Sequence, residues 1–233
     1  MRGCLMFVPH YYRPESPHGW LDIVESYPLA TLVTSASPYP RITHLPIVVD
    51  RDCDRVQCDT LLGHMNRSNP HWLDLVDGCP GVLIFNGPNA YISPAYYEQR
   101  VASPTWNFVS VHVSGTIHPI VGGKPTMDVV RKTVRTFESS HGQGWDDTHS
   151  IEYFESIVSG VGAFRFRVSN VDSMFKLSQE KDSATQRRVI DRLMSSGRSA
   201  DGDIANLMRP SGSDQEHRGG GCDSQSHGTF GQD

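Results

Sequence analysis

The chain consists mainly of short stretches with the pattern of β-strands, and helices do not alternate regularly with them. Extended segments are predicted at residues 29–34, 43–49, 57–62, 81–85 and 161–168. The longest candidate runs from Trp106 to Val121, where Val109, Val111 and Val113 alternate with polar or mixed residues. This period is typical of a half-buried strand. Because regular βαβ alternation is missing, the pattern favours an antiparallel barrel with helices at its ends over a doubly wound sheet.

Proline, glycine and asparagine mark the predicted ends of several of these segments. The sequence NGPN at Asn86–Asn89 predicts a turn before the chain becomes extended again at Tyr91–Ile92. Asn69 followed by Pro70 has the pattern of a helix cap and first helical residue, which predicts a helix through Val76.

The composition changes sharply after Ser195. Residues 196–233 contain eight glycines and six serines but only four large apolar residues. Such a stretch buries too little apolar surface to offset its conformational entropy. We therefore predict a folded domain over residues 1–195 and a disordered, Gly/Ser-rich acidic tail over residues 196–233.

Charge and hydropathy exclude several classes of protein. The formal net charge is −5, whereas nucleic-acid binding requires a surplus of Lys and Arg. The tail contributes −3 of that charge, so the stronger argument against a nucleic-acid partner is that the body lacks a basic patch. No apolar run is long enough to span a membrane, and the N-terminus is too short in its apolar part for a signal peptide. The five cysteines form no CxxC pair, and we expect a cytoplasmic protein.

One motif, GHMNRSNPHW at residues 63–72, combines a histidine with anion-binding residue types between a predicted strand and a predicted helix. His64 could ligate a metal or move a proton, and Arg67 with Asn69 could hold an anion beside the helix N-terminus. The competing interpretation makes His64 a hydrogen-bonded core histidine and Asn69 a helix cap. From spacing alone, we favour that second interpretation.

Two further segments contain residue types that suit a cofactor. Trp106 and Asn107 stand at the start of the longest strand, where a planar aromatic ligand could stack, although Trp106 could equally close the barrel end. Lys176, in the sequence FKLSQEK, could pair with a phosphate or propionate or could be an ordinary solvated lysine. His44 and His112 lie on predicted strands and are the other histidine candidates for a pocket.

Taken together, seven segments resemble the PaiB-like family of FMN-binding negative transcriptional regulators, and they occur in the family's order. They are MFVPHYYR (6–13), YPLATLVT (27–34), THLPIVVD (43–50), GHMNRSNPHW (63–72), NGPNAYISPAYY (86–97), PTWNFVSVHVSG (104–115) and FKLSQEK (175–181). The resemblance implies an α+β FMN-binding split barrel, antiparallel and six-stranded with Greek-key connections and peripheral helices. It also implies a homodimer with cofactor sites at the subunit interface.

Within that family, the chain is most similar to piperazate synthases, which are haem enzymes that form L-piperazic acid from N5-hydroxy-L-ornithine with loss of water. The resemblance implies haem b with His64 as the axial iron ligand. It places Trp106 and Asn107 beside the macrocycle, and Arg67, Asn69 or Lys176 near its propionates or the substrate carboxylate. The reaction needs a base for the substrate amine, for which His44 and His112 are both candidates.

Two other functions remain open at this point. In an FMN-dependent oxidoreductase of the same fold, Arg67 and Lys176 would hold the phosphate and Trp106 would lie beside the flavin. A regulator without catalytic activity is the second alternative, against which stand the lack of a helix-turn-helix pattern and the acidic charge balance.

Overall fold

The computed structural model describes residues 6–51, 60–99 and 101–209, and within them six antiparallel strands close into a barrel. The order around the barrel is β1-β2-β3-β6-β5-β4, with β4 pairing again with β1. The strands are β1 (Leu29–Thr34), β2 (Arg41–Val49), β3 (Thr60–Asn66), β4 (Cys79–Ile92), β5 (Thr105–Pro119) and β6 (Val161–Lys176). The six-stranded antiparallel barrel predicted from the sequence is thereby confirmed.

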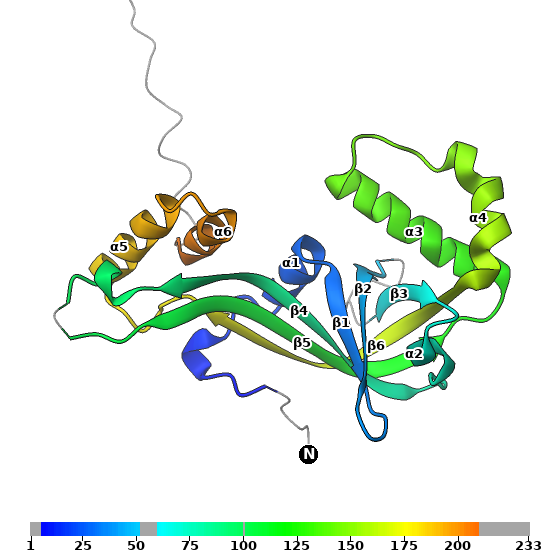
Figure 1. Ribbon diagram of the computed structural model, residues 1–233, viewed down its shortest axis with the longest axis horizontal. Coiled ribbons are helices and arrows are strands. Elements are labelled where there is room, and N and C mark those ends of the chain that lie inside the picture. Colours follow the sequence, from blue (N-terminus) through cyan, green and yellow to red (C-terminus); the bar gives the residue numbers. More distant parts are fainter. Residues whose placement is uncertain (1–5, 52–59, 100, 210–233) are drawn as a thin grey trace, which may run out of the picture.

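The strands differ greatly in length, and this difference shapes the molecule. β4, β5 and β6 contain 14, 15 and 16 residues, whereas β1 contains only six. At about 3.3 Å per residue, β5 spans roughly 50 Å, so the three long strands continue well past the barrel. They form a three-stranded ribbon that extends to the left in Figure 1. We call this ribbon, with the helices on it, the arm.

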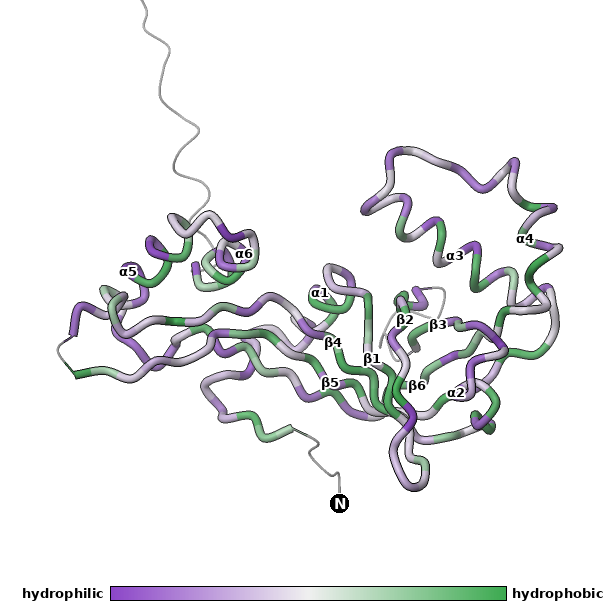
Figure 2. Tube along the Cα trace, viewed as in Figure 1, coloured by the Kyte–Doolittle hydropathy of each residue, from purple (hydrophilic) through white to green (hydrophobic). Residues whose placement is uncertain are grey.

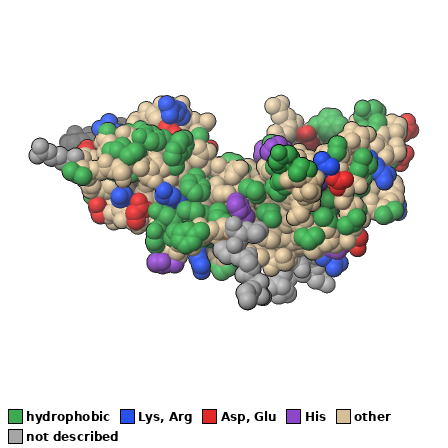
Figure 3. Space-filling view, turned by 60° about the horizontal axis from the view of Figure 1, so that its bottom comes forward, with side chains coloured by type: hydrophobic (Ala, Val, Ile, Leu, Met, Phe, Trp, Pro, Cys, Tyr) green, Lys and Arg blue, Asp and Glu red, His purple; other side chains and the backbone are tan. Residues whose placement is uncertain are grey.

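The helices cover the barrel and the arm separately. They are α1 (Gly19–Ser26), α2 (Pro70–Leu73), α3 (Gly123–His141), α4 (Ile151–Ile157), α5 (Ser183–Met194) and α6 (Ser199–Met208). Figure 1 shows α5 and α6 over the outer part of the arm, α1 near its middle, and α3 and α4 beside the barrel. The space-filling view in Figure 3 shows the same two lobes joined by a narrower middle.

The main core lies inside the barrel and continues along the helix-covered side of the arm. Val109, Val111 and Val113 are buried on one face of β5, as their alternation predicts. Figure 2 shows hydrophobic segments where the strands converge and more hydrophilic residues along the outer helices. A smaller cluster, which includes Val48, Leu62 and Val129, packs α3 against β2 and β3.

The NGPN segment does not end a strand, contrary to the turn predicted there. β4 continues from Cys79 to Ile92, and its register against β5 shifts between Asn86 and Asn89. A side chain at Gly87 would place its Cβ 3.1 Å from Val109 Cβ, so the residue's small size allows the close approach of β5. Gly and Pro therefore mark a β-bulge here, which keeps both strand halves in one ribbon.

The boundary predicted at residue 195 is wrong, because the chain is ordered beyond it. α6 extends over Ser199–Met208 and buries Ile204, Ala205 and Met208 in the main core. These few apolar residues share one helix face and dock on β4 and α5, which offsets the low apolar content of the segment. The rest of the predicted tail, residues 210–233, lies outside the described residues.

Candidate functional site

A pocket of about 530 Å³ opens at the barrel end, between β2, β3 and the end of α4. We call it the His64 pocket. It brings together three of the residues predicted from the sequence, His44, His64 and Asn69. Its lining residues are Thr43, His44, Leu45, Pro46, His64, Met65, Asn66, Asn69, Ile157, Gly160 and Val161.

His64 is the most unusual polar side chain in this pocket. It lies on β3 opposite Ala163 of β6, and burial lowers the pKa of its imidazole. Its Nδ1 atom is buried, and among the described residues no group hydrogen-bonds to it. A buried polar atom normally has a partner, so this ring has unused bonding capacity. A neutral imidazole with a free nitrogen is the form that binds a metal.

Two contacts position Arg67, which follows His64 by three residues in the same motif. A side chain on Gly162 would place its Cβ 2.3 Å from the Trp72 ring, so only glycine lets the indole lie directly on β6. The Arg67 guanidinium carbon lies 6.0 Å from the centre of that ring. The Arg67 backbone amide also donates to the Gly160 carbonyl at 2.9 Å. The Arg67 backbone is therefore fixed beside Gly160, which lines the His64 pocket, while its exposed guanidinium lies near Trp72.

Asn69 performs the role that spacing alone predicts for it, as a helix cap. Its Oδ1 accepts a hydrogen bond from the His71 backbone amide at 2.9 Å at the start of α2. Its Nδ2 donates to Thr43 Oγ1 at 3.3 Å. Asn69 therefore borders the pocket with both ends of its amide already engaged.

His44 and His112 differ in their relation to His64. His44 is exposed on β2, lines the His64 pocket, and bonds through Nδ1 to Thr31 Oγ1 at 3.0 Å. His112 is paired with Asp172 in the register of β5 and β6, and burial lowers its pKa against the opposing effect of that carboxylate. Only His44 shares a pocket with His64.

The register shows how far apart the predicted site residues are. His64 faces Ala163, whose carbonyl accepts from the Ile120 amide just past the end of β5. His112 lies eight residues from Ile120 and Trp106 fourteen. Measured along the strand at roughly 3.3 Å per residue, these separations are about 26 Å and 46 Å. Trp106, Asn107 and Lys176 therefore belong to the arm, and one chain cannot bring them to a cofactor held by its own His64.

At the end of the arm, Trp106 and Lys176 offer groups that a ligand could reach. Trp106 is 52% exposed and meets Tyr91 edge-on, with ring centres 6.0 Å apart. Lys176 Nζ donates to Thr105 Oγ1 at 2.6 Å and lies 6.0 Å from the centre of the Tyr12 ring.

The side chain of Asn107, which the sequence predicts at the cofactor, lies inside the protein and not on an open surface. Its side chain is completely buried, and its Nδ2 donates to Ser178 Oγ at 2.9 Å and to Met208 Sδ at 3.4 Å. Ser178 Oγ in turn donates to Asn107 Oδ1 at 3.1 Å. These bonds join α6 and the β6–α5 connection to β5, so the amide serves contacts within the protein.

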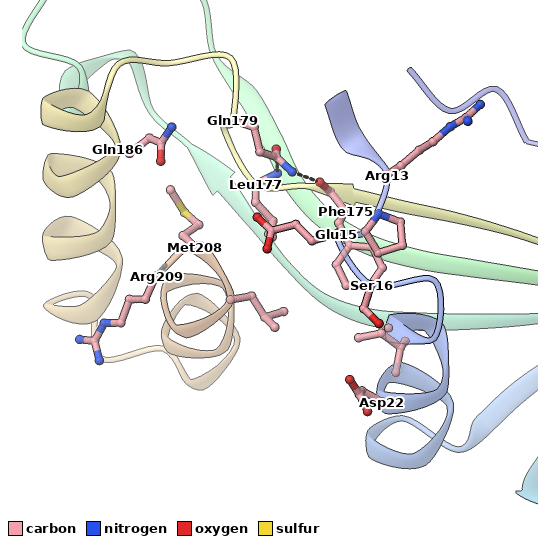
Figure 4. A pocket seen from close by; sticks show the side chains of 14 residues that line it. Arg13, Glu15, Ser16, Asp22, Phe175, Leu177, Gln179, Gln186, Met208 and Arg209 are labelled. Carbon is pink, nitrogen blue, oxygen red and sulfur yellow. Dashed lines mark hydrogen bonds between the residues drawn. The ribbon is translucent and has the colours of Figure 1, made fainter. Parts of the chain in front are cut away.

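A second cavity, of about 450 Å³, lies between the N-terminal segment, the end of β6 and α6 (Figure 4). Phe175 and Leu177 line it, whereas Lys176 between them does not, as alternation along a strand requires. Gln179 accepts from the Leu177 amide at 2.7 Å and donates to the Phe175 carbonyl, which shapes the wall of the cavity. The FKLSQEK motif therefore places its apolar residues and its lysine on opposite sides.

His71 and Thr43 are the residues at this site that sequence reasoning missed. His71 is the buried residue of α2, with Nε2 2.9 Å from Thr34 Oγ1 and Nδ1 2.9 Å from Thr43 Oγ1. His71 belongs to the same ten-residue motif as His64, but its spacing gave no sign that two threonines from β1 and β2 would meet it.

Comparisons with known proteins agree with this architecture. A family model described as "Putative FMN-binding domain" matches residues 6–170. The Bacillus subtilis (strain 168) protein named "Protease synthase and sporulation protein PAI 2" is 26% identical over 204 residues, covering 87% of this chain and 96% of that protein.

Solved structures share the same fold. The flavocytochrome Anf3 from Azotobacter vinelandii superposes with a TM-score of 0.54 at 14% identity, covering 76% of each chain. The FAD and heme binding protein from Mycobacterium smegmatis gives a TM-score of 0.52 at 13% identity, covering 75% of this chain and 78% of that one. In the part of this chain that the structure describes, no helix has the length and apolar character needed to cross a membrane.

Proposed function

This chain belongs to the FMN-binding-domain family whose model spans residues 6–170, and on that premise we propose that it is a haem-dependent piperazate synthase. The PaiB-like resemblance found in the sequence is confirmed by the family match and by the Bacillus subtilis relative. The proposed reaction converts N5-hydroxy-L-ornithine into L-piperazic acid. The observation that carries the proposal is His64, which lines an open pocket and whose buried Nδ1 has no hydrogen-bond partner among the described residues.

The residues of the pocket fit haem b. His64 would hold the haem iron, for which a single protein imidazole is enough. The low pKa of His64 keeps the ring unprotonated, as ligation requires. Arg67 has its backbone bonded to Gly160 of the pocket and an exposed guanidinium near Trp72, and we assign that guanidinium to a propionate or the substrate carboxylate. The two proteins of the same fold whose names include haem or cytochrome show that this fold accommodates such a group.

The chemistry balances without an external oxidant or reductant. The α-amine nitrogen bonds to N5, the N5–O bond breaks, and the departing hydroxide combines with one amine proton to give water. Bound haem would supply an iron with one open position, which can polarise the N–O bond. The protein must orient the chain so that the two nitrogens approach, and it must keep the amine neutral.

His44 is the better placed of the two candidate bases. It lines the His64 pocket, and its bond to Thr31 through Nδ1 leaves Nε2 for the substrate amine. His112 lies about 26 Å farther along the arm of the same chain, at roughly 3.3 Å per residue. We assign His44 the general-base role and His112 none in its own subunit's site.

A homodimer would bring the arm residues into use. Trp106 and Lys176 cannot reach their own His64 pocket, but a two-fold partner could place them at the other subunit's pocket. We propose that the active form is such a dimer, in the cytoplasm, with neither nucleic acid nor membrane as a partner.

The decisive experiment records the absorption spectrum of the purified protein and then its turnover of N5-hydroxy-L-ornithine. A Soret band that disappears in His64→Ala, together with loss of turnover, supports the proposal. His141→Ala, which removes an exposed histidine at the end of α3, serves as the matched control. Retained haem and full turnover in His64→Ala would contradict it.

Complementation tests the dimer. His64→Ala and Trp106→Ala are prepared separately and then mixed under conditions that exchange subunits. Mixed dimers contain one intact composite site, so an equal mixture should recover about a quarter of wild-type turnover. If the mixture stays as inactive as its components, or if the protein is monomeric in solution, the partner's arm does not contribute to the site.

The alternative function is an FMN-binding oxidoreductase or a PaiB-type regulator, and the family's description favours it. In that case Arg67 and Lys176 would hold the phosphate, and Trp106 would lie beside the flavin. A flavin absorption band in place of the Soret band decides for FMN. Haem-loaded protein that leaves N5-hydroxy-L-ornithine unchanged would favour the regulator.

A further inference from the structure

Three side chains at the barrel end form a continuous row of hydrogen bonds. Thr43 Oγ1 lies 2.9 Å from His71 Nδ1, and His71 Nε2 lies 2.9 Å from Thr34 Oγ1. Asn69 Nδ2 adds a bond to Thr43 Oγ1 at 3.3 Å. Both imidazole nitrogens therefore face hydroxyl groups, and a hydroxyl can donate or accept. Either tautomer of His71 satisfies every bond in the row.

The two ends of this row open into different cavities. Thr43 lines the His64 pocket, together with His44 and His64. Thr34 lines a separate groove of about 650 Å³, formed by the end of β1, the start of β4, residues 114–116 near the end of β5, and the middle of β6. His71 is only 2% exposed and fills the space between them.

The surroundings of His71 keep it neutral. Burial and the positive charge of Arg41 on β2 lower its pKa, and Asp74 at the end of α2 opposes this. Arg41 and Asp74 also pair with each other at 2.5 Å, which limits the effect of each on the ring. An uncharged imidazole has one N–H and one free nitrogen, which is the state that can pass a proton through itself.

We propose that Thr43, His71 and Thr34 form a proton relay between the His64 pocket and the groove beyond it, with His71 as the residue that transfers the proton. This inference rests on the proposed function, because the substrate's α-ammonium group must lose one proton to become the neutral amine. The water formed in the reaction takes up a different amine proton, so this first proton must leave the pocket. It adds a positioning residue, His71, that touches neither substrate nor cofactor.

The transfer balances atom by atom. A proton from the pocket arrives at Thr43 Oγ1 while the hydroxyl proton of Thr43 moves to His71 Nδ1. The proton on His71 Nε2 moves to Thr34 Oγ1, and the hydroxyl proton of Thr34 passes to water in the groove. One proton has then crossed with no change in oxidation state. Rotation of the two hydroxyls, together with loss of the Nδ1 proton and uptake of a proton at Nε2 by exchange with solvent, restores the starting tautomer.

The relay requires that His71 populates both of its tautomers, and nuclear magnetic resonance can measure this. In the cofactor-free protein labelled with ¹⁵N at histidine, the relay predicts averaged signals for His71 Nδ1 and Nε2, because both tautomers interconvert. A ring held in one fixed tautomer could not transfer a proton between the two hydroxyls, so that result would contradict the relay. This measurement needs neither haem nor turnover, so it gives an answer even if the proposed reaction is wrong.

Three variants test the relay in the haem-loaded enzyme. Glutamine in His71→Gln can bond to both threonines but cannot exchange tautomers, so turnover should fall about tenfold or more. Thr34→Val should lower turnover similarly while KM and the Soret band stay unchanged, because Thr34 lies outside the His64 pocket. Thr133→Val, which removes a buried hydroxyl from α3, is the matched control and should keep full turnover.

The proposal is supported if His71 shows averaged tautomers and both relay variants lose turnover but keep haem. It is overturned by a single fixed tautomer, or by full turnover in either His71→Gln or Thr34→Val. If the wild-type protein binds haem but does not turn over N5-hydroxy-L-ornithine, the proposed function fails. The tautomer measurement then decides the relay alone.

Discussion

The barrel end and the arm end of this molecule use similar residues for opposite purposes. At the barrel end, His64 keeps a buried nitrogen without a partner among the described residues, and it does so beside an open pocket. At the arm end, Asn107 is fully buried with its amide bonded to Ser178 and Met208. An unsatisfied group at a pocket indicates a ligand site, whereas a satisfied buried amide indicates scaffold. Whether a buried polar group has a hydrogen-bond partner therefore distinguishes a ligand site from the scaffold better than residue type does.

The largest expected effect comes from Gly162 at the barrel end. Gly162→Val forces the Trp72 ring away from β6 and should lower the free energy of unfolding by about 3 kcal/mol. The displaced indole would also release Arg67, so haem affinity should fall. Gly160→Ala is the control, because a Cβ there meets nothing within 4 Å. Urea denaturation measures both variants, and equal stabilities would show that the glycine at position 162 is not required by Trp72.

A smaller effect is expected from Asn107 at the arm end. Asn107→Ala leaves Ser178 without its partner and loosens α6, which should cost about 2 kcal/mol of unfolding free energy. Haem binding, measured by the Soret band, should not change, since the amide touches no cofactor. The control is Asn206→Ala, which alters an exposed asparagine on α6. Loss of haem from folded Asn107→Ala would show that this residue contributes to haem binding. It would contradict the assignment of Asn107 to the scaffold.

The smallest effect is a difference in acid sensitivity between the ends. His64 and His71 have lowered pKa values, so the unfolded chain takes up protons below pH 6.5 that the folded barrel end resists. Stability of the cofactor-free protein should therefore fall from pH 7.5 to pH 5.5, by at most about 1.4 kcal/mol per histidine. His71→Gln should show a smaller fall, and an equal fall would contradict the neutral state of His71.

Asp182, which caps α5 on the arm, provides the control for that experiment. Bonds from Thr185 lower the pKa of its carboxyl, so it remains ionised at both pH values. Its contribution is present above the unfolded pKa and is lost only in stronger acid. The change in stability caused by Asp182→Asn should be the same at pH 7.5 and at pH 5.5.

Much of the barrel could be predicted from local patterns, because alternation and turn chemistry are encoded within a few neighbouring residues. The valines of β5 face inward as their alternation requires, and Asn69 caps α2 as its position before Pro70 indicates. The prediction was wrong where one local signal fits two structures. Gly and Pro at residues 86–89 suit a turn and a bulge equally well, and the pairing of β4 with β5 decides between them.

The sequence by itself determined the antiparallel barrel, the family, and the motif that contains His64, since these depend on local periodicity and on the order of motifs. Only the tertiary structure decided that His44 shares a pocket with His64, that Asn107 is buried scaffold, and that α6 is ordered. It also brought Thr34, Thr43 and His71 into one hydrogen-bonded row. The physical reason is that such contacts join residues far apart in the chain, and their free energy depends on register and packing that no single segment contains.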